Sequence, residues 1–207
     1  MITFDYKKEY KEYYMPPTKP VITNIPAMNY LAVRGTGNPN IGGGDYQEAI
    51  GLLYGVAYTL KMSHKSNYKI KGFFEYVVPP LEGFWWNEKD LNTLDKDYFH
   101  LISLIRLPDF ITKADFDWAI VEATKKKKLD FTQVEFLTYD EGLCVACMHI
   151  GSYDSEPATI QAMEKEALSQ GYTIDINSQR FHHEIYLSNP RKGDTTKTKT
   201  VIRHPIK

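Results

Sequence analysis

Apolar and polar positions alternate along this chain with two different periods, which together predict a mixed α+β protein. Residues 28–35 (MNYLAVRG) alternate as a strand does, and the glycine-rich residues 35–44 that follow predict a turn. From Asp45 onward, apolar side chains recur at helical spacing, at Tyr46, Ile50, Leu53, Ala57 and Leu60. The first part of the chain therefore predicts a strand, a glycine loop and a helix.

The rest of the chain continues in the same two periods. Predicted strands cover residues 69–80 and 81–86, which meet at two prolines, and then residues 98–108, 130–139, 142–153, 180–191 and 199–207. One predicted helix covers residues 113–128, where Thr112 and Asp115 suit a capping box. A later helix is predicted to begin near Asp154 or Ser155 and to end at Gly171.

The order strand, loop, helix, strand, strand occurs twice, which indicates an internal duplication. The pseudo-repeats are predicted at about 21–90 and 130–207, with a strand-helix insertion at about 97–128. In this alignment PLEGFWW takes the place of HHEIYLS, so that Glu82 corresponds to Glu184. Duplicated β-α-β-β units predict antiparallel sheets with helices on one side and a ligand groove between the halves. Residues 1–20, which end in PPTKP, are predicted to be an arm outside a single domain at 21–207.

The charge balance narrows the class of partner. With 25 basic and 26 acidic residues and a formal charge of -1, the chain offers no electrostatic case for direct binding to nucleic acid or to an anionic membrane. A neutral or cationic small molecule fits better. The N-terminus lacks the apolar core of a signal peptide, and two cysteines suit a reducing compartment, so a cytoplasmic location is expected.

The glycine-rich turn lies between a strand and a helix, where a phosphate-binding loop would lie. Its spacing does not fit that function, because Gly35, Gly37 and Gly42 do not form G-x-G-x-x-G and no G-K-[ST] follows. The glycines are therefore expected to supply tight turns.

Cys144 and Cys147 have the C-x-x-C spacing of redox and zinc sites. They lie in a predicted apolar strand, where positions three apart point to opposite faces, and the chain has no further cysteines. Buried, inert thiols are the favoured interpretation. Cys147, His149, His182 and Glu184 would bind a metal only if two strands were neighbours with these faces aligned, and no metal is expected.

Two glutamates in predicted strands have aromatic or histidine neighbours two positions away. Glu82 is followed by Phe84, and Glu184 lies between His182 and Tyr186. A glutamate on a solvated strand face is the common alternative. A carboxylate within an aromatic wall can bind a flat cation or act as a base when desolvation raises its pKa.

These features together resemble the GyrI-like (gyrase-inhibitor-like) family of small-molecule-binding domains. The resemblance rests on AVRGTGNPN, the following helix with AIGLLYGVAYTLK, PPLEGFWW and the closing HHEIYLSNPR, and it covers residues 20–207. It implies two SH2-like halves around a groove that takes planar hydrophobic or cationic molecules without a cofactor. Stand-alone members include hydrolases that detoxify cyclopropane-bearing, DNA-alkylating natural products.

The resemblance also implies roles for particular residues. Glu184 corresponds to the glutamate of the closing strand and is predicted to be the general base that activates water. Glu82 would be its pseudo-symmetric helper. The predicted stacking residues are Phe84, Trp86, Trp118 and Tyr186. Tyr54 or His149 is predicted to donate a hydrogen bond to the ligand.

Two rival functions remain open from the sequence. One is a non-catalytic multidrug-binding or sensing protein in which Glu184 only pairs with a ligand cation. The other, suggested by the family name, is a protein that contacts DNA gyrase. The segment before Val21 is too short for a DNA-reading unit, so transcriptional control by this chain alone is not expected.

Overall fold

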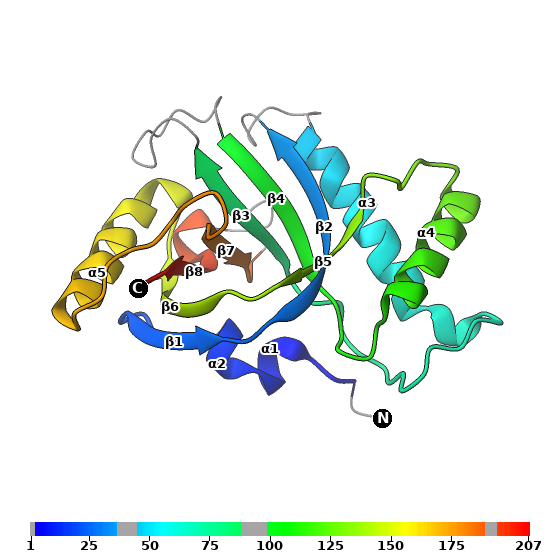
Figure 1. The fold of residues 1–207 in the computed structure, drawn as a ribbon, viewed down its shortest axis with the longest axis horizontal. Helices are drawn as coiled ribbons and strands as arrows, with labels where there is room; N and C mark the ends of the chain where they lie inside the picture. Colours follow the sequence, from blue (N-terminus) through cyan, green and yellow to red (C-terminus); the bar gives the residue numbers. More distant parts are fainter. Residues whose placement is uncertain (1–2, 37–44, 88–98, 189–193) are drawn as a thin grey trace.

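A single antiparallel sheet organises the computed structural model, which describes residues 3–36, 45–87, 99–188 and 194–207 (Figure 1). Its eight strands follow the order β1-β6-β8-β7-β3-β4-β2-β5. The strands are β1 Val21–Ile25, β2 Met28–Thr36, β3 Leu81–Asn87, β4 Phe99–Arg106, β5 Glu135–Tyr139, β6 Gly142–Ile150, β7 His182–Tyr186 and β8 Lys199–Pro205. The α+β class predicted from the sequence is confirmed.

Two long helices cover one face of the sheet, and they lie over opposite ends of it. Helix α3 (Asp45–Lys61) packs on β2 and β4, whereas α5 (Glu156–Ser169) packs on β6 and β1 (Figure 1). Helix α4 (Lys113–Lys127) packs on α3. We call this the helix face. Shorter helices are α1 (Tyr6–Glu9), α2 (Lys11–Tyr14), η1 (Ser63–Lys65), η3 (Tyr153–Ser155) and η4 (Thr195–Lys197).

The strand order has the symmetry of a duplication. Read from the two edges inward, β1-β6-β8-β7 mirrors β5-β2-β4-β3, and the two halves meet where β3 pairs with β7. Strand β1 precedes β2 in the chain but pairs with β6, while β5 precedes β6 but pairs with β2. The halves thus exchange their first strands. Strand β4 takes the place in one half of the sheet that β8 takes in the other.

The predicted strand at residues 69–80 is wrong. This segment joins no strand ladder, and Tyr76 makes only an isolated parallel bridge with Phe4. Pro79 and Pro80 remove two backbone donors, so this stretch cannot extend the ladder of β3. The predicted strand at 81–86 is present as β3.

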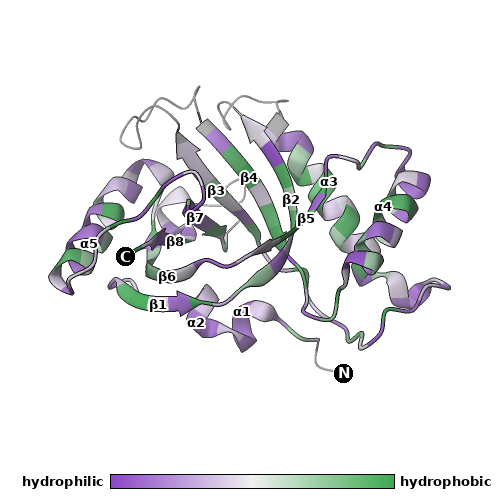
Figure 2. Cartoon of the chain, in the orientation of Figure 1, coloured by the Kyte–Doolittle hydropathy of each residue, from purple (hydrophilic) through white to green (hydrophobic). Residues whose placement is uncertain are grey.

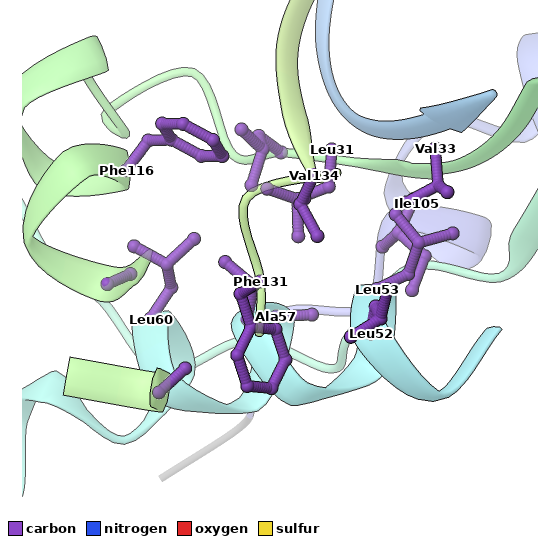
Figure 3. Close-up of a cluster of buried hydrophobic side chains, with 14 of the residues drawn as sticks. Leu31, Val33, Leu52, Leu53, Ala57, Leu60, Ile105, Phe116, Phe131 and Val134 are labelled. Atoms are coloured by element: carbon purple, nitrogen blue, oxygen red, sulfur yellow. The ribbon is translucent and has the colours of Figure 1, made fainter. Parts of the chain in front are cut away.

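The largest hydrophobic cluster lies between α3, α4 and the sheet (Figure 3). Thr112 and Asp115 form the predicted capping box at the start of α4, which fixes where that helix begins. Gly55 lets α3 pack closely against Phe131, because a Cβ at residue 55 would lie 2.5 Å from the ring of Phe131. Hydrophobic positions run along β2 and β4, while hydrophilic positions recur on α4 and α5 (Figure 2).

The N-terminal arm packs on the opposite face of the sheet, which we call the arm face. Tyr6 and Tyr14 are buried there with Ile185 and Val201. The guanidinium of Arg106 lies 4.9 Å from the centre of the Tyr6 ring, a cation–π contact. Residues of the arm therefore pack on the sheet through buried aromatic rings.

Some predictions fall outside the described residues. Most of the glycine-rich turn, residues 37–44, and the NPR that closes the HHEIYLSNPR motif are among them. Across the described ranges, no helix is long and apolar enough to span a bilayer.

Candidate functional site

Glu184 lies at the centre of the sheet on the helix face. On β7 it pairs with Gly83 of β3 on one side and with Ile202 of β8 on the other. Directly paired residues share a face, and Ile202 belongs to the hydrophobic cluster under α5. Because successive residues alternate, His182 and Tyr186 share the helix face, and His183 points to the arm face.

A continuous line of hydrogen bonds passes through Glu184. The Trp85 indole Nε1–H donates to the Tyr186 hydroxyl at 3.0 Å, and that hydroxyl donates to Glu184 Oε2 at 2.7 Å. Glu184 Oε1 lies 2.9 Å from His182 Nε2, and His182 Nδ1 lies 2.7 Å from His204 Nε2. Both carboxylate oxygens are thus held in place by neighbours.

Gly83 makes room for half of this line. A Cβ at residue 83 would lie 2.7 Å from Trp85 Nε1 and 3.0 Å from the Tyr186 hydroxyl. Both distances are at or below the closest approach of real Cβ atoms, and the atoms met belong to two rigid rings. A glycine at this position therefore allows Trp85 and Tyr186 to meet above the strand.

Aromatic rings surround the carboxylate on the helix face. The Tyr46 ring from the first turn of α3 lies 6.0 Å from that of Trp85. The Tyr153 ring from η3 lies edge-on to Tyr186, with 6.3 Å between ring centres. Rings from both halves therefore converge around Glu184, which suits contact with a flat ligand.

Glu184 is ionised at neutral pH. Burial alone would raise its pKa, but the hydrogen bonds that His182 and Tyr186 donate hold the pKa below its usual range. Burial and the charge of Glu184 raise the pKa of Tyr186 well above its usual range, so this hydroxyl keeps its proton. The same causes raise the pKa of Tyr153.

Three of the predicted site residues lie on the face of the sheet opposite to Glu184. Glu82, Phe84 and Trp86 belong to the arm face, because Glu82 pairs with Ile185 and Phe84 with His183. Glu82 and Glu184 do not share a face, since Gly83 and not Glu82 lies opposite Glu184. A shift of one residue in a strand reverses the face of every side chain.

Glu82 instead takes part in a buried ion network. Glu82 Oε2 lies 2.9 Å from His183 Nε2, and His183 Nδ1 lies 3.1 Å from both carboxylate oxygens of Glu141. Arg203 Nη1 donates to Glu141 Oε2 at 2.9 Å. The Tyr14 hydroxyl donates to Glu82 at 3.4 Å, which links the arm to the network. Phe84 packs edge-on against the His183 ring, and Trp86 stacks on His100.

The remaining predicted residues, Trp118, Tyr54 and His149, contact side chains or backbone other than Glu184. Trp118 on α4 stacks on Tyr68 with ring centres 4.3 Å apart, within the cluster under α3 and α4. The Tyr54 ring packs against the same cluster and contacts Tyr58. His149 shares the helix face, but its ring nitrogens lie 2.8 Å from Thr159 Oγ1 and 3.0 Å from the Ser152 carbonyl oxygen.

Sequence reasoning missed Tyr46, Trp85, Tyr153 and His204. The available signal was the alternation of β3, in which Gly83 and Trp85 share a face that Glu82 does not. No sequence pattern brings the first turn of α3 and η3 to the same strand, because that meeting depends on the pairing of β3 with β7.

The alternative metal site is not assembled. Cys147 and His149 lie on β6, whereas His182 and Glu184 lie on β7, and β8 separates the two strands. Within the described residues, no group of three or more potential ligands could hold a metal ion. Cys144 and Cys147 are free, buried thiols, and burial raises the pKa of both.

Comparisons with known proteins show which family the sequence matches. The GyrI-like small molecule binding domain family matches residues 18–207. No curated protein matches the sequence significantly.

Solved structures give whole-length matches. A hydrolase from Listeria innocua is 39% identical, with a TM-score of 0.91, over 99% of this chain and 100% of that one. An uncharacterized conserved protein from Listeria innocua is 41% identical, with a TM-score of 0.93, over 99% and 100%. The EcmrR C-terminal domain, at 13% identity and a TM-score of 0.52 over 91% and 96%, shares only the fold.

The family match spans nearly the whole chain, and it agrees with the duplicated sheet and with the aromatic surroundings of Glu184. The chain therefore belongs to the GyrI-like small-molecule-binding domain family.

Proposed function

We propose that this protein binds planar hydrophobic molecules on the helix face, above β3 and β7, and hydrolyses cyclopropane-bearing electrophiles. Glu184 is the general base of this reaction. Trp85, Tyr46, Tyr153 and Tyr186 supply the aromatic contacts. The single observation that carries the proposal is an ionised carboxylate with both oxygens oriented by donors among aromatic rings.

The chemistry needs only water and a positioned base. In a cyclopropane conjugated to a dienone, the water oxygen bonds to the ring methylene while the strained carbon–carbon bond breaks. The electron pair of that bond passes into the dienone and leaves a phenolate, which takes a proton from solvent. Glu184 accepts the proton that water loses. One water is added in total, and no oxidant or cofactor takes part.

Glu184 suits the role of a base in its orientation and its charge. The sequence-based expectation of a raised pKa is not met: the lowered pKa keeps Glu184 ionised near neutrality and able to accept a proton, and it also makes the carboxylate a weaker base than a free one. Each carboxylate oxygen has a second lone pair beyond the one used by His182 or Tyr186. A water bound there would be oriented before the substrate arrives, which lowers the entropic part of the barrier.

The phenolate oxygen needs a donor, and Tyr153 is our candidate. Its hydroxyl keeps its proton because burial and the charge of Glu184 raise its pKa. Its ring is 39% exposed and adjoins Tyr186, so a ligand from solvent can reach it. Tyr153 would thus replace Tyr54 and His149 in the role that the sequence suggested for them. Preoriented donors at a developing oxyanion are among the larger contributions to catalysis.

The comparisons support a hydrolytic activity. Two solved structures from Listeria innocua that are 39% and 40% identical over nearly the whole chain are described as hydrolases. Their substrates do not follow from that description, so the cyclopropane chemistry rests on the resemblance to stand-alone GyrI-like hydrolases.

A non-catalytic binder is the second candidate. A carboxylate that stays ionised within aromatic rings is also a good counter-ion for a flat cation. In that case Glu184 would contribute affinity, and no product would form.

Turnover and binding separate the two candidates. Wild-type protein and Glu184→Gln are incubated with a cyclopropane-bearing dienone of the duocarmycin type, and mass spectrometry follows the gain of one water. The proposal expects catalytic conversion by the wild type and at least a hundredfold loss in the variant, a typical value for a lost general base. Binding, measured by tryptophan fluorescence, should persist. Saturable binding without product in either protein would establish the binder instead.

A further inference from the structure

Among the described residues, His204 ends the line of hydrogen bonds that passes through Glu184. It lies on β8, is 3% exposed, and approaches His182 Nδ1 with its Nε2 at 2.7 Å. Its other ring nitrogen, Nδ1, is buried and has no hydrogen-bond partner in the described part of the chain.

The unpartnered nitrogen indicates where the proton of His204 lies. Burial, and then the proximity of His182, lower the pKa of His204 well below its usual range, so the ring is neutral and carries one N–H. A proton on Nδ1 would bury an N–H donor with no acceptor. A proton on Nε2 leaves only an unused lone pair and lets the ring donate to His182. Buried donors without acceptors are rarer than unused acceptors, so Nε2–H is the favoured form.

This form of His204 fixes the form of His182. His182 Nδ1 must accept the hydrogen bond, so the proton of His182 lies on Nε2 and points at Glu184 Oε1, 2.9 Å away. From the other side, Tyr186 donates to Oε2, because its hydroxyl already accepts from Trp85, whose indole can only donate. Two chains of donors therefore converge on one carboxylate.

We propose that His204 is a positioning residue that holds His182 in the Nε2–H form and so keeps a donor on Glu184. Its effect on turnover rests on the proposed function, but its effect on proton positions does not. The proton that Glu184 takes from water leaves toward the ligand side, because His182 Nε2 already carries a proton and cannot accept another.

Other titratable groups face the same carboxylate. Tyr153 on η3 approaches from the loop before α5, Tyr46 on α3 lies near Tyr186, and His183 acts through the sheet from the arm face. None of these contacts the His182–His204 pair in the hydrogen bonds of the described residues. A change at residue 204 therefore reaches Glu184 through His182.

Nuclear magnetic resonance of the imidazole nitrogens tests the proton positions directly. In wild-type protein at pH 7, we expect both His182 and His204 to carry a proton on Nε2 and none on Nδ1. A proton on Nδ1 of either ring, in a neutral or a charged form, would overturn the inference.

The carboxyl carbon of Glu184 reports the consequence. In His204→Leu, the donor to His182 is gone, and we expect the titration midpoint of Glu184 to rise by about one unit. His204→Gln is the matched control, because its amide can reach the same position and donate, so its midpoint should stay near the wild-type value. Equal midpoints in all three proteins, or equal shifts in both variants, would show that His204 only packs. Both measurements are free of substrate, so they decide this inference even if no dienone is hydrolysed.

Discussion

Glu82 and Glu184 lie on neighbouring central strands but on opposite faces of the sheet. Glu82 pairs with Ile185, and Gly83 pairs with Glu184, so the two carboxylates never share a surface. Glu82 is buried with His183 and Tyr14, whereas Glu184 lies among aromatic rings between α3 and α5. Two glutamates with similar sequence surroundings therefore lie in different environments.

The first prediction separates stability from turnover. Glu82→Gln leaves His183 and Arg203 with one carboxylate fewer in a buried network, so the free energy of unfolding should fall by about 3–5 kcal/mol. Turnover per folded molecule should change little. In Glu184→Gln, turnover should fall and the free energy of unfolding should change little. Urea unfolding and product formation measure the two quantities, and a large loss of turnover in folded Glu82→Gln would refute the assignment of faces.

The second prediction compares adjacent tryptophans. Trp85 contacts Tyr46 and Tyr186 on the helix face, while Trp86 stacks on His100 on the other. Trp85→Phe should weaken binding of a planar ligand by about 1 kcal/mol, roughly fivefold in Kd. Trp86→Phe should leave Kd unchanged. Calorimetric titration is suitable, and a larger effect at Trp86 would place the ligand on the wrong face.

The third prediction concerns Gly83. Its replacement by alanine places a methyl group 2.7 Å from Trp85 Nε1, so the indole must move and the Trp85–Tyr186 hydrogen bond is lost. We expect stability to fall by about 1–3 kcal/mol, the usual cost of overpacking, and ligand binding to weaken with it. Gly51 on α3 provides the control, because a Cβ there meets nothing within 4 Å. Equal binding by both alanine variants would contradict the role of Gly83.

The fourth prediction is a dependence of stability on pH. His183 and Arg203 outweigh the effect of burial and lower the pKa of Glu141 from 4.5 to about 2. Its contribution is therefore complete above about pH 4.5 and is lost as the pH falls toward 2. Burial by itself would lower the pKa of His183, but the neighbouring carboxylates of Glu141 and Glu82 raise that pKa above 6.5. Its contribution is complete below pH 6.5 and is lost as the pH rises through the raised value.

The two groups together favour the interval between about pH 4.5 and 6.5. Urea unfolding across pH 3–9 should therefore show greatest stability there. In Glu141→Gln the decline on the acid side should become shallower. A wild-type stability that keeps rising above pH 7 would contradict a protonated His183.

Most of the fold followed from the sequence, whereas several of the side chains that surround Glu184 did not. Helix α4 was predictable because Thr112 and Asp115 specify its start, and α5 because Pro157 and Gly171 bound it. The face of β3 was not predictable in this way. LEGFWW contains large apolar side chains on both faces, because both faces are buried. Alternation therefore shows which of its residues share a face, but not which of the two faces lies beside Glu184.

The arm and the exchange of strands were also beyond local patterns. Tyr6 and Tyr14 pack on β7 and β8, which lie far away in the chain. The pairing of β1 with β6 and of β5 with β2 depends on the pseudo-symmetry of the whole sheet. The shared face of Glu184, His182 and Tyr186 was predictable, because alternation along one strand fixes it.

The most direct test of Glu184 as a base is a single turnover of the dienone in water labelled with oxygen-18, with protein in excess. If Glu184 activates water, the label appears in the product and the protein stays unlabelled. If Glu184 itself attacks the cyclopropane, hydrolysis of the resulting ester leaves the product unlabelled and puts the label in the peptide that contains Glu184. The account predicts a labelled product, and label in that peptide would contradict it.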